Sequence, residues 1–302
     1  MVRTDLASEA VQQAGSDIEG IKSSEEKKGD ITITRVEVLN EQGEKAIGKK
    51  IGNYVTISMK PFSEMSIEEQ KNAQEVTAAE IRAMSNGNVF KNVLIAGLGN
   101  RNVTADSLGP AVCDNVFVTR HFSQDMIPEE LKGKLNAVSA ISPGVLGVTG
   151  IETGEIIRGV VKNVKPDLVL VVDSLASRSL DRIMTTIQLS DAGISPGSGI
   201  GNKRFTIDKE TLKVPVIAIG VPLVVYASTI AYDLISEALG NANDANRIKT
   251  LVDKISKVNG STMVVTPKEI DFIVDTCASV VSSAIEYAIQ GSEVQQQLEL
   301  IS

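Results

Sequence analysis

The chain has 302 residues, a formal net charge of −8, 42% hydrophobic residues and only 3% aromatic residues. This length fits one large α/β domain with additions, and the core has to be built from aliphatic side chains. The negative charge argues against a nucleic-acid partner, because phosphate binding needs clustered Lys and Arg. No apolar run reaches about 18 residues, so we expect no membrane span and no membrane partner.

Cysteine and histidine usage narrows the chemistry further. Cys113 and Cys277 have no CxxC spacing, and no signal-peptide pattern is found, so we interpret them as free thiols in a reducing cytoplasm. The single histidine, His121 in VTRHFSQ, has no Cys or Asp at ligand spacing and is interpreted as a surface residue. A Ser-His-Asp triad, a zinc site with two histidines, and any metal or cofactor are therefore not expected. Acid–base chemistry would depend on carboxylates.

The N-terminal part is expected to be mostly outside the core. Residues 1–30 are polar with mixed charges, which is typical of an arm or a loosely held segment. Within it, Thr4 or Asp5 could cap a short helix through Ala7–Gln13.

A strand pair and a helix are predicted next. Ile31–Val38 and Asn53–Lys60 alternate apolar and polar residues, which indicates paired strands with one exposed face. Ser66 and Glu69 have capping-box spacing and predict a helix over Ile67–Met84.

From residue 91 the pattern changes to buried strands alternating with helices. Continuous apolar runs predict parallel strands at Asn92–Asn100, Asn136–Ser142, Asp167–Asp173 and Val214–Gly220. Helices are expected at Leu108–Val118, Gly154–Val164, Ala227–Leu239 and Lys268–Ile289. This alternation predicts an α/β fold with a doubly wound, mostly parallel sheet, helices on both faces, and an N-terminal β-rich addition.

Two carboxylates follow buried strands. Asp106 stands in GLGNRNVTADSLGP, just before a helix, and Asp173 is predicted to be the last residue of the strand LVLVVD. Sites in open α/β sheets lie at the carboxyl ends of strands, so the two are expected to meet there. Neighbouring carboxylates split their pKa values, which lets one hold a proton while the other acts as a base.

Structural alternatives remain for these stretches. An Asp before a helix is an ordinary N-cap, and both aspartates fit that pattern. The GLGN turn lacks the third glycine of a dinucleotide-binding GxGxxG motif, so nucleotide binding is not favoured. The Gly- and Pro-rich stretches Ser142–Glu155 and Ser190–Arg204 could shape a binding surface or serve as plain crossovers.

Five motifs in order carry a family resemblance. They are RTDLA followed by Glu9, GLGNRNVTADSLGP, SPGVLGVTGIET, VDSLASRS and TTIQLSDAGISPGSGIGNKR. Together they resemble the germination protease of spore-forming bacteria, the endopeptidase that begins digestion of small acid-soluble spore proteins. The resemblance implies that Asp106 and Asp173 are the catalytic acids.

The resemblance also implies a fold like that of the hydrogenase-maturation endopeptidases, in which the matching acids bind a metal together with a histidine. No such histidine can be placed here. The chain departs from the family pattern at Ser195, where GIHPGSG has a histidine, and at Tyr226, where an acid is expected.

The resemblance further explains the first residues. The family is made as a zymogen that removes its own short N-terminal peptide, and its substrates are cut between an acid and a large apolar residue followed by Ala and a further acid. TDLASE has this form, which predicts self-cleavage between Asp5 and Leu6, with a donor-rich or cationic subsite for Asp5 and Glu9. Residues 1–5 are then a propeptide. Residues 6–302 form one peptidase domain, with the arm, strand pair and helix at 6–90 and the α/β core at 91–302.

The resemblance therefore implies a cytoplasmic endopeptidase of the forespore and spore core that acts on small acid-soluble spore proteins as a homotetramer. Two alternatives remain open. One is a metal-dependent maturation-type endopeptidase, and the other is a non-catalytic regulatory protein on the same fold.

Overall fold

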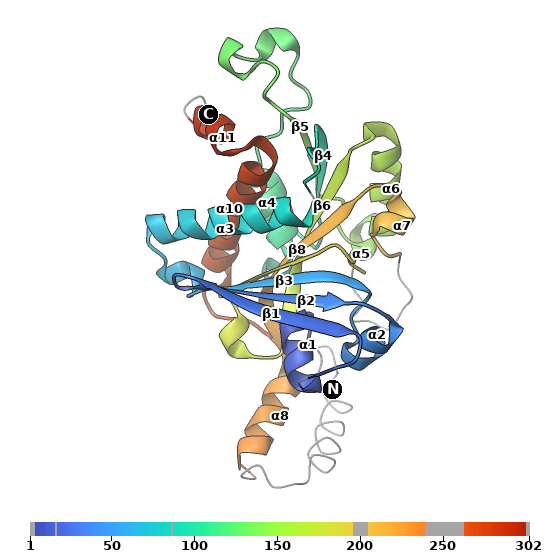
Figure 1. The fold of residues 1–302 in the computed structure, drawn as a ribbon, viewed down its shortest axis with the longest axis vertical. Coiled ribbons are helices and arrows are strands. Elements are labelled where there is room, and N and C mark those ends of the chain that lie inside the picture. The colour runs from blue at the N-terminus through green and yellow to red at the C-terminus, as the bar shows by residue number, and fades with distance from the viewer. Residues whose placement is uncertain (1–3, 16, 86, 196–204, 239–262, 300–302) are drawn as a thin grey trace.

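The structure, a computed structural model, describes residues 4–15, 17–85, 87–195, 205–238 and 263–299. Its centre is one nine-stranded sheet (Figure 1). The strands follow in the order β1 (Ile21–Lys28), β2 (Ile31–Val38), β3 (Gly52–Ser58), β7 (Thr186–Ser190), β8 (Val216–Tyr226), β6 (Leu168–Ser177), β4 (Asn92–Gly97) and β5 (Ala137–Ile141), with β9 (Val264–Val265) paired to β8.

The sheet joins a parallel half to an antiparallel half. β8, β6, β4 and β5 are parallel, while β1, β2, β3 and β7 run antiparallel to their neighbours, and β7 pairs antiparallel with β8. The predicted parallel α/β core with an N-terminal β addition is thus confirmed. The addition is fused to the core, because β3 pairs with β7 along five residues.

Helices cover both faces of this sheet. On one face α3 (Ile67–Met84), α4 (Leu108–Asn115) and α10 (Ile270–Gln290) pack over the largest apolar cluster. On the other face α6 (Thr153–Val164) and α7 (Lys209–Leu212) cover the parallel strands, and α1 (Ala7–Ala14) and α2 (Glu41–Ile47) cover the antiparallel strands. The described residues also include the α-helices α5 (Leu146–Thr149), α8 (Ala227–Ala238) and α11 (Ser292–Glu299).

Local sequence explains where several of these elements begin. The Ser66 side chain accepts from the Glu69 backbone and Glu69 accepts from the Ser66 backbone, so the predicted capping box starts α3 as expected. In β4, Val93 and Ile95 face the α3 side while Leu94 faces α6, which is why this strand is apolar throughout.

The prediction of a loose arm over residues 1–30 is wrong. All eight residues of β1 pair with β2, although nearly all of them are exposed. An edge strand with two solvated faces has a polar composition, so composition alone does not distinguish it from an arm. The helix α1 is also packed, with Ala7, Ser8, Glu9 and Ala10 buried, and its N-cap is Leu6, without a side-chain cap from Thr4 or Asp5.

Among the helices in the described part of the chain, one satisfies the length and composition of a membrane span. This is α10, which has 21 residues and contains an 18-residue window with a mean hydropathy of 1.4. It packs against α3 and α4, and residues such as Val274, Val280 and Ile285 are fully covered by the main core. Its apolar sequence is therefore accounted for by its place in the core.

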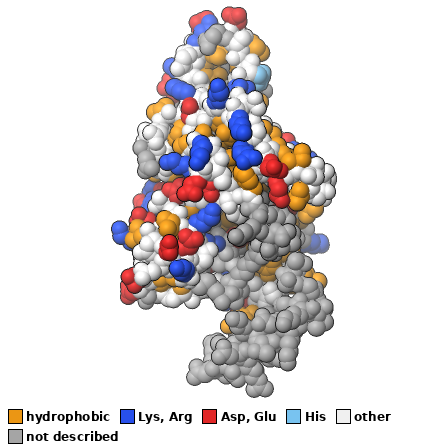
Figure 2. Space-filling view, turned by 90° about the vertical axis from the view of Figure 1, so that its right-hand side faces the viewer, with side chains coloured by type: hydrophobic (Ala, Val, Ile, Leu, Met, Phe, Trp, Pro, Cys, Tyr) orange, Lys and Arg blue, Asp and Glu red, His pale blue; other side chains and the backbone are white. Residues whose placement is uncertain are grey.

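The surface carries both signs of charge. Figure 2 shows the side that bears α6 and α7, where Lys and Arg side chains alternate with Asp, Glu and hydrophobic ones. The net charge of −8 is therefore not gathered into a single acidic field on this face.

Candidate functional site

Asp106 is held by the loop that follows β4. Gly99 has a φ of +110°, and a Cβ there would lie 2.0 Å from the Asp106 carbonyl oxygen, so only glycine allows the loop to close this tightly. The backbone N–H of Asn100 donates to the carbonyl and to the carboxylate of Asp106, each at 2.9 Å. The N-cap of α4 is Ser107, so Asp106 does not cap that helix.

Asp173 lies within β6 rather than at its end. The strand continues to Ser177, four residues beyond the position predicted as its last. The Asp173 carboxylate accepts from the backbone N–H of Ser174 at 2.9 Å, and no helix follows that it could cap. The longer strand is possible because β8 continues beside it through Val225, with a β-bulge after Leu175.

Both aspartates line one cavity of about 990 Å³. It lies on the face of α1, α2 and α6, and the start of the chain reaches it through Asp5. Ser195 and Tyr226, the two departures from the family pattern, line the same cavity. Most of the Gly- and Pro-rich stretch 190–204 lies outside the described residues.

Burial raises the pKa of both carboxyl groups. The pKa of Asp106 is raised by burial, against the hydrogen bond from Asn100, which lowers it. The pKa of Asp173 is raised well above its usual range, first by burial and then by the negative charges of Asp106 and Asp5. Both shifts favour the protonated carboxyl group, and the mutual charge makes it unfavourable for both groups to be ionised at once.

The start of the chain is bound in this cavity by strand groups. The Asp5 N–H donates to the carbonyl of Ala176 at 2.8 Å, and the Ala176 N–H donates to the Asp5 carboxylate at 2.8 Å. The Gln188 amide spans the Asp5–Leu6 bond: its Nε2 donates to the Asp5 carbonyl oxygen at 3.0 Å, and its Oε1 accepts from the Ala7 N–H at 2.7 Å. Leu6 is fully buried.

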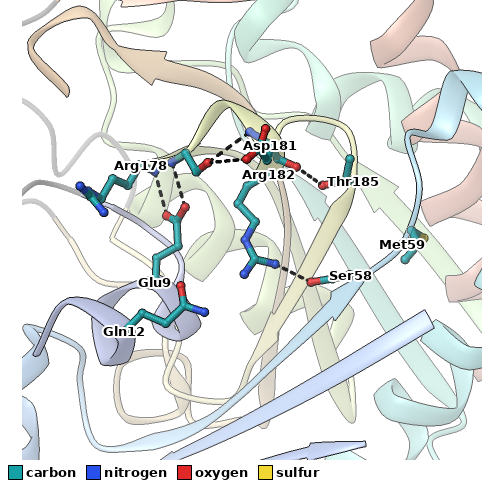
Figure 3. A pocket seen from close by; sticks show the side chains of 9 residues that line it. Glu9, Gln12, Ser58, Met59, Arg178, Asp181, Arg182 and Thr185 are labelled. Atoms are coloured by element: carbon teal, nitrogen blue, oxygen red, sulfur yellow. Dashed lines mark hydrogen bonds between the residues drawn. The ribbon is translucent and has the colours of Figure 1, made fainter. Parts of the chain in front are cut away.

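The acid downstream of that bond is also held by the backbone. The Glu9 carboxylate accepts from the N–H groups of Arg178 and Ser179 at 2.8 and 2.9 Å, just beyond the end of β6 (Figure 3). Thr4 donates a further hydrogen bond to Glu9. These residues border a second cavity of about 440 Å³, where Arg182 donates to Ser58 at 2.7 Å. The carboxylates of Asp5 and Glu9 are thus bound by hydrogen-bond donors. These donors are peptide N–H groups and, for Glu9, also the Thr4 hydroxyl.

The other chemically active side chains lie apart from this arrangement. His121 is exposed at a turn, with its ring against the edge of Phe122. Burial raises the pKa of the Cys113 and Cys277 thiols to about 11 and about 12. Across the ranges that the structure describes, no three His, Cys, Asp or Glu residues gather as a metal-binding group.

Several residues of this arrangement were not singled out from the sequence. Ala176, Arg178 and Ser179 act through their backbone, which no side-chain pattern reveals. Gln188 faces the cavity between Ile187 and Leu189, which face the core. A polar residue between two apolar ones in a strand is ordinarily a solvent-facing position, so only its tertiary position marks it out.

The cavity thus holds two acidic side chains, one on a strand and one in the turn after β4, together with a stretch of the chain whose Asp5–Leu6 peptide bond is contacted on both sides by Gln188. The family model for germination protease matches residues 2–246. Germination proteases of Caldanaerobacter subterraneus, Clostridium tetani and Bacillus velezensis are 44%, 40% and 39% identical, covering 98%, 96% and 96% of this chain and 97%, 95% and 93% of their own. The chain belongs to the germination protease family and is an endopeptidase of spore germination.

Among solved structures, the chain shows a similarity to a NiFe hydrogenase maturation protease from Thermococcus kodakarensis. It is 17% identical, with 65% of this chain and 94% of that chain covered and a TM-score of 0.35. A likeness at this level carries no argument about the site.

The raised pKa of Asp173 predicts a pH dependence of stability. A folded-state pKa above the unfolded value of about 3.9 means that the folded chain holds a proton that the unfolded chain releases. The free energy of unfolding contributed by this group therefore falls as pH rises from about 4 to the folded-state pKa. Asp173→Asn should gain stability relative to wild type through that window, as measured by urea unfolding at a series of pH values.

Asp114→Asn is the control, because its effect on the free energy of unfolding should change with pH in the opposite direction. The ion pair with Arg101 lowers the pKa of Asp114, so this pair stabilises the folded chain above the unfolded pKa, and its removal should cost stability as pH rises. The effect should be small, because both partners are exposed. A stability difference for Asp173→Asn that stays constant or declines as pH rises would contradict the assignment.

Proposed function

We propose that this chain hydrolyses peptide bonds with the Asp106–Asp173 pair, and that its first target is its own Asp5–Leu6 bond. The observation that carries the proposal is that Asp5 and both carboxylates line one cavity, in which Gln188 contacts the residues on both sides of that bond.

The proposed reaction uses the two carboxyl groups in opposite protonation states. The ionised carboxylate takes a proton from a water molecule while the oxygen of that water attacks the Asp5 carbonyl carbon. The protonated group then gives its proton to the leaving nitrogen of Leu6 as the C–N bond breaks. The products are a carboxyl group on Asp5 and a free amine on Leu6, and the pair again shares one proton.

The contacts of the bound segment support a specificity for acid, large apolar residue, and later acid. Leu6 is fully buried, and a buried leucine contributes about 1.5–3 kcal/mol of apolar burial. Asp5 and Glu9 each accept hydrogen bonds from backbone N–H groups of the β6 region. A cleavage sequence of the same form in another protein would be held by the same groups.

The wider role follows from the family. We propose small acid-soluble spore proteins as substrates, a homotetrameric assembly, and a cytoplasmic location in the forespore and spore core. Residues 1–5 would be the propeptide and residues 6–302 one peptidase domain, which the single continuous sheet supports.

The aspartate pair is tested by Asp106→Asn and Asp173→Asn. Each change keeps the size of the side chain and removes a group that gains or loses a proton, so cleavage of an acidic spore protein should collapse while folding is kept. Gel-based cleavage assays and thermal unfolding check the two outcomes. Near-normal cleavage by either variant would show that the pair is not the catalytic centre. Asp114→Asn, which removes an exposed carboxylate, is the matched control.

Self-processing should shorten the chain by residues 1–5 and leave Leu6 as the new N-terminus. Leu6→Ala should lose about 2–3 kcal/mol of transition-state binding, because the leucine is fully buried. Asp5→Lys should slow self-cleavage more than Leu6→Ala does, because a cation would face the Ala176 N–H donor. Intact mass and N-terminal sequencing follow the cut. A retained Met1, or a cut elsewhere that ignores Leu6→Ala, would refute this account.

Chelation separates this proposal from a metal-dependent maturation-type peptidase. The chain has one histidine, and His121 is exposed at a turn, so the aspartates lack a histidine partner for a metal. Cleavage of a spore protein should survive exhaustive dialysis against a chelator. Loss of cleavage that one added divalent ion restores would favour the metal-dependent mechanism instead.

A further inference from the structure

The Gln188 side chain has the contacts expected of a group that acts on the reacting carbonyl. It lies on β7, is 7% exposed, and donates from Nε2 to the carbonyl oxygen of Asp5 at 3.0 Å. This is the oxygen that becomes negatively charged when water adds to the Asp5 carbonyl carbon. We propose that Gln188 is a catalytic residue that stabilises this oxyanion; the inference rests on the proposed cut at Asp5–Leu6.

The orientation of the Gln188 amide is fixed by its second contact. Its Oε1 accepts from the N–H of Ala7 at 2.7 Å. Exchange of Oε1 and Nε2 would set two N–H groups against each other at Ala7 and two carbonyl oxygens against each other at Asp5. Only one orientation therefore satisfies both partners, and in that orientation the donor faces the scissile carbonyl.

The sheet register sets Gln188 opposite the aspartate. Asp173 on β6 pairs with Gly220 on β8, and Gly220 pairs with Gln188 on β7. Paired residues face the same side of a sheet, and Cα atoms two strands apart are separated by about 9–10 Å. A Cβ on Gly220 would lie 2.5 Å from the Leu175 side chain, so the position between them is kept for glycine.

This register gives the two sides of the carbonyl different partners. The carboxylate pair supplies the base that takes the proton of the attacking water, while the neutral amide donates a hydrogen bond to the oxygen. As the C–O bond forms, the π electrons of the carbonyl move onto that oxygen, and the Nε2–H bond strengthens. When the C–N bond breaks, the carbonyl reforms and the Leu6 nitrogen takes the proton of the other carboxyl group.

The test measures the first-order rate of Asp5–Leu6 cleavage in the full chain by intact mass. Gln188→Met keeps the length of the side chain and removes the donor, so the rate should fall about 100- to 1,000-fold, the cost of losing one oxyanion donor. Gln290→Met is the matched control. Gln290 is also 7% exposed and also makes two hydrogen bonds, both to the backbone of Asn136. Its replacement should leave the rate close to that of wild type.

Gln188→Glu tests the hydrogen-bond donor directly. A glutamate keeps an oxygen to accept from Ala7, but it donates to the Asp5 carbonyl only when it is protonated. Its rate relative to wild type should therefore be low at neutral pH and should rise as pH falls. If Gln188→Glu cleaves like wild type at every pH, the reaction does not use this donor, and that result would overturn the inference.

The remaining outcomes distinguish this inference from the proposed function. If Asp173→Asn blocks the cut while Gln188→Met cleaves at the wild-type rate, or slows no more than Gln290→Met does, the role of Gln188 is refuted and the aspartate mechanism stands. If Asp173→Asn still cuts at Asp5–Leu6, the proposed function fails first.

Discussion

The cavity depends on keeping a carboxyl group half-buried on a strand of the central sheet. Asp173 continues the apolar face of β6 formed by Val169 and Val171, yet it faces a cavity instead of a helix. Burial of an ionised carboxylate is costly, and the neighbouring charge of Asp106 adds to the cost. The fold tolerates the pair because one proton can be kept there, and under the proposed function the same proton serves acid–base chemistry.

The extension of β6 and β8 past their apolar runs connects this constraint to the N-terminal segment. Beyond Asp173, the backbone of Ala176, Arg178 and Ser179 has N–H or carbonyl groups that meet Asp5 and Glu9. These N–H donors carry no net charge, so they bind acids without the lowering of nearby pKa values that a cation in their place would cause. Under the proposed function, binding of acidic cleavage sequences by these groups is thus compatible with a protonated carboxyl group, although Lys49 and Lys50 also line the cavity.

The sequence predicts most of what local patterns determine. The capping box of Ser66 and Glu69 starts α3, and the apolar runs give β4, β6 and β8, because two covered faces require such runs. The edge strand β1 was missed, since solvated faces leave no apolar pattern. The motif match brought Asp106 and Asp173 forward as candidates. The position of Gln188 in the cavity could not be predicted from the sequence. It depends on the pairing of Gln188 with Gly220, which is set by the register of strands far apart in the chain.

The bound segment also shapes what cleavage at Asp5–Leu6 achieves under the proposed function. The contacts of Leu6, Ala7 and Glu9 all lie on the side of the bond that stays with the chain, and Leu6 and Ala7 are fully buried. Among the residues that the structure describes, hydrolysis therefore removes the contacts of Thr4 and Asp5 and leaves those of Ala7 with Gln188 and of Glu9 with Arg178 and Ser179. A substrate needs the same N–H groups, so α1 has to leave its place before another cleavage sequence can bind. The new charged amine at Leu6 favours this departure, because an ammonium group in a buried position loses its hydration.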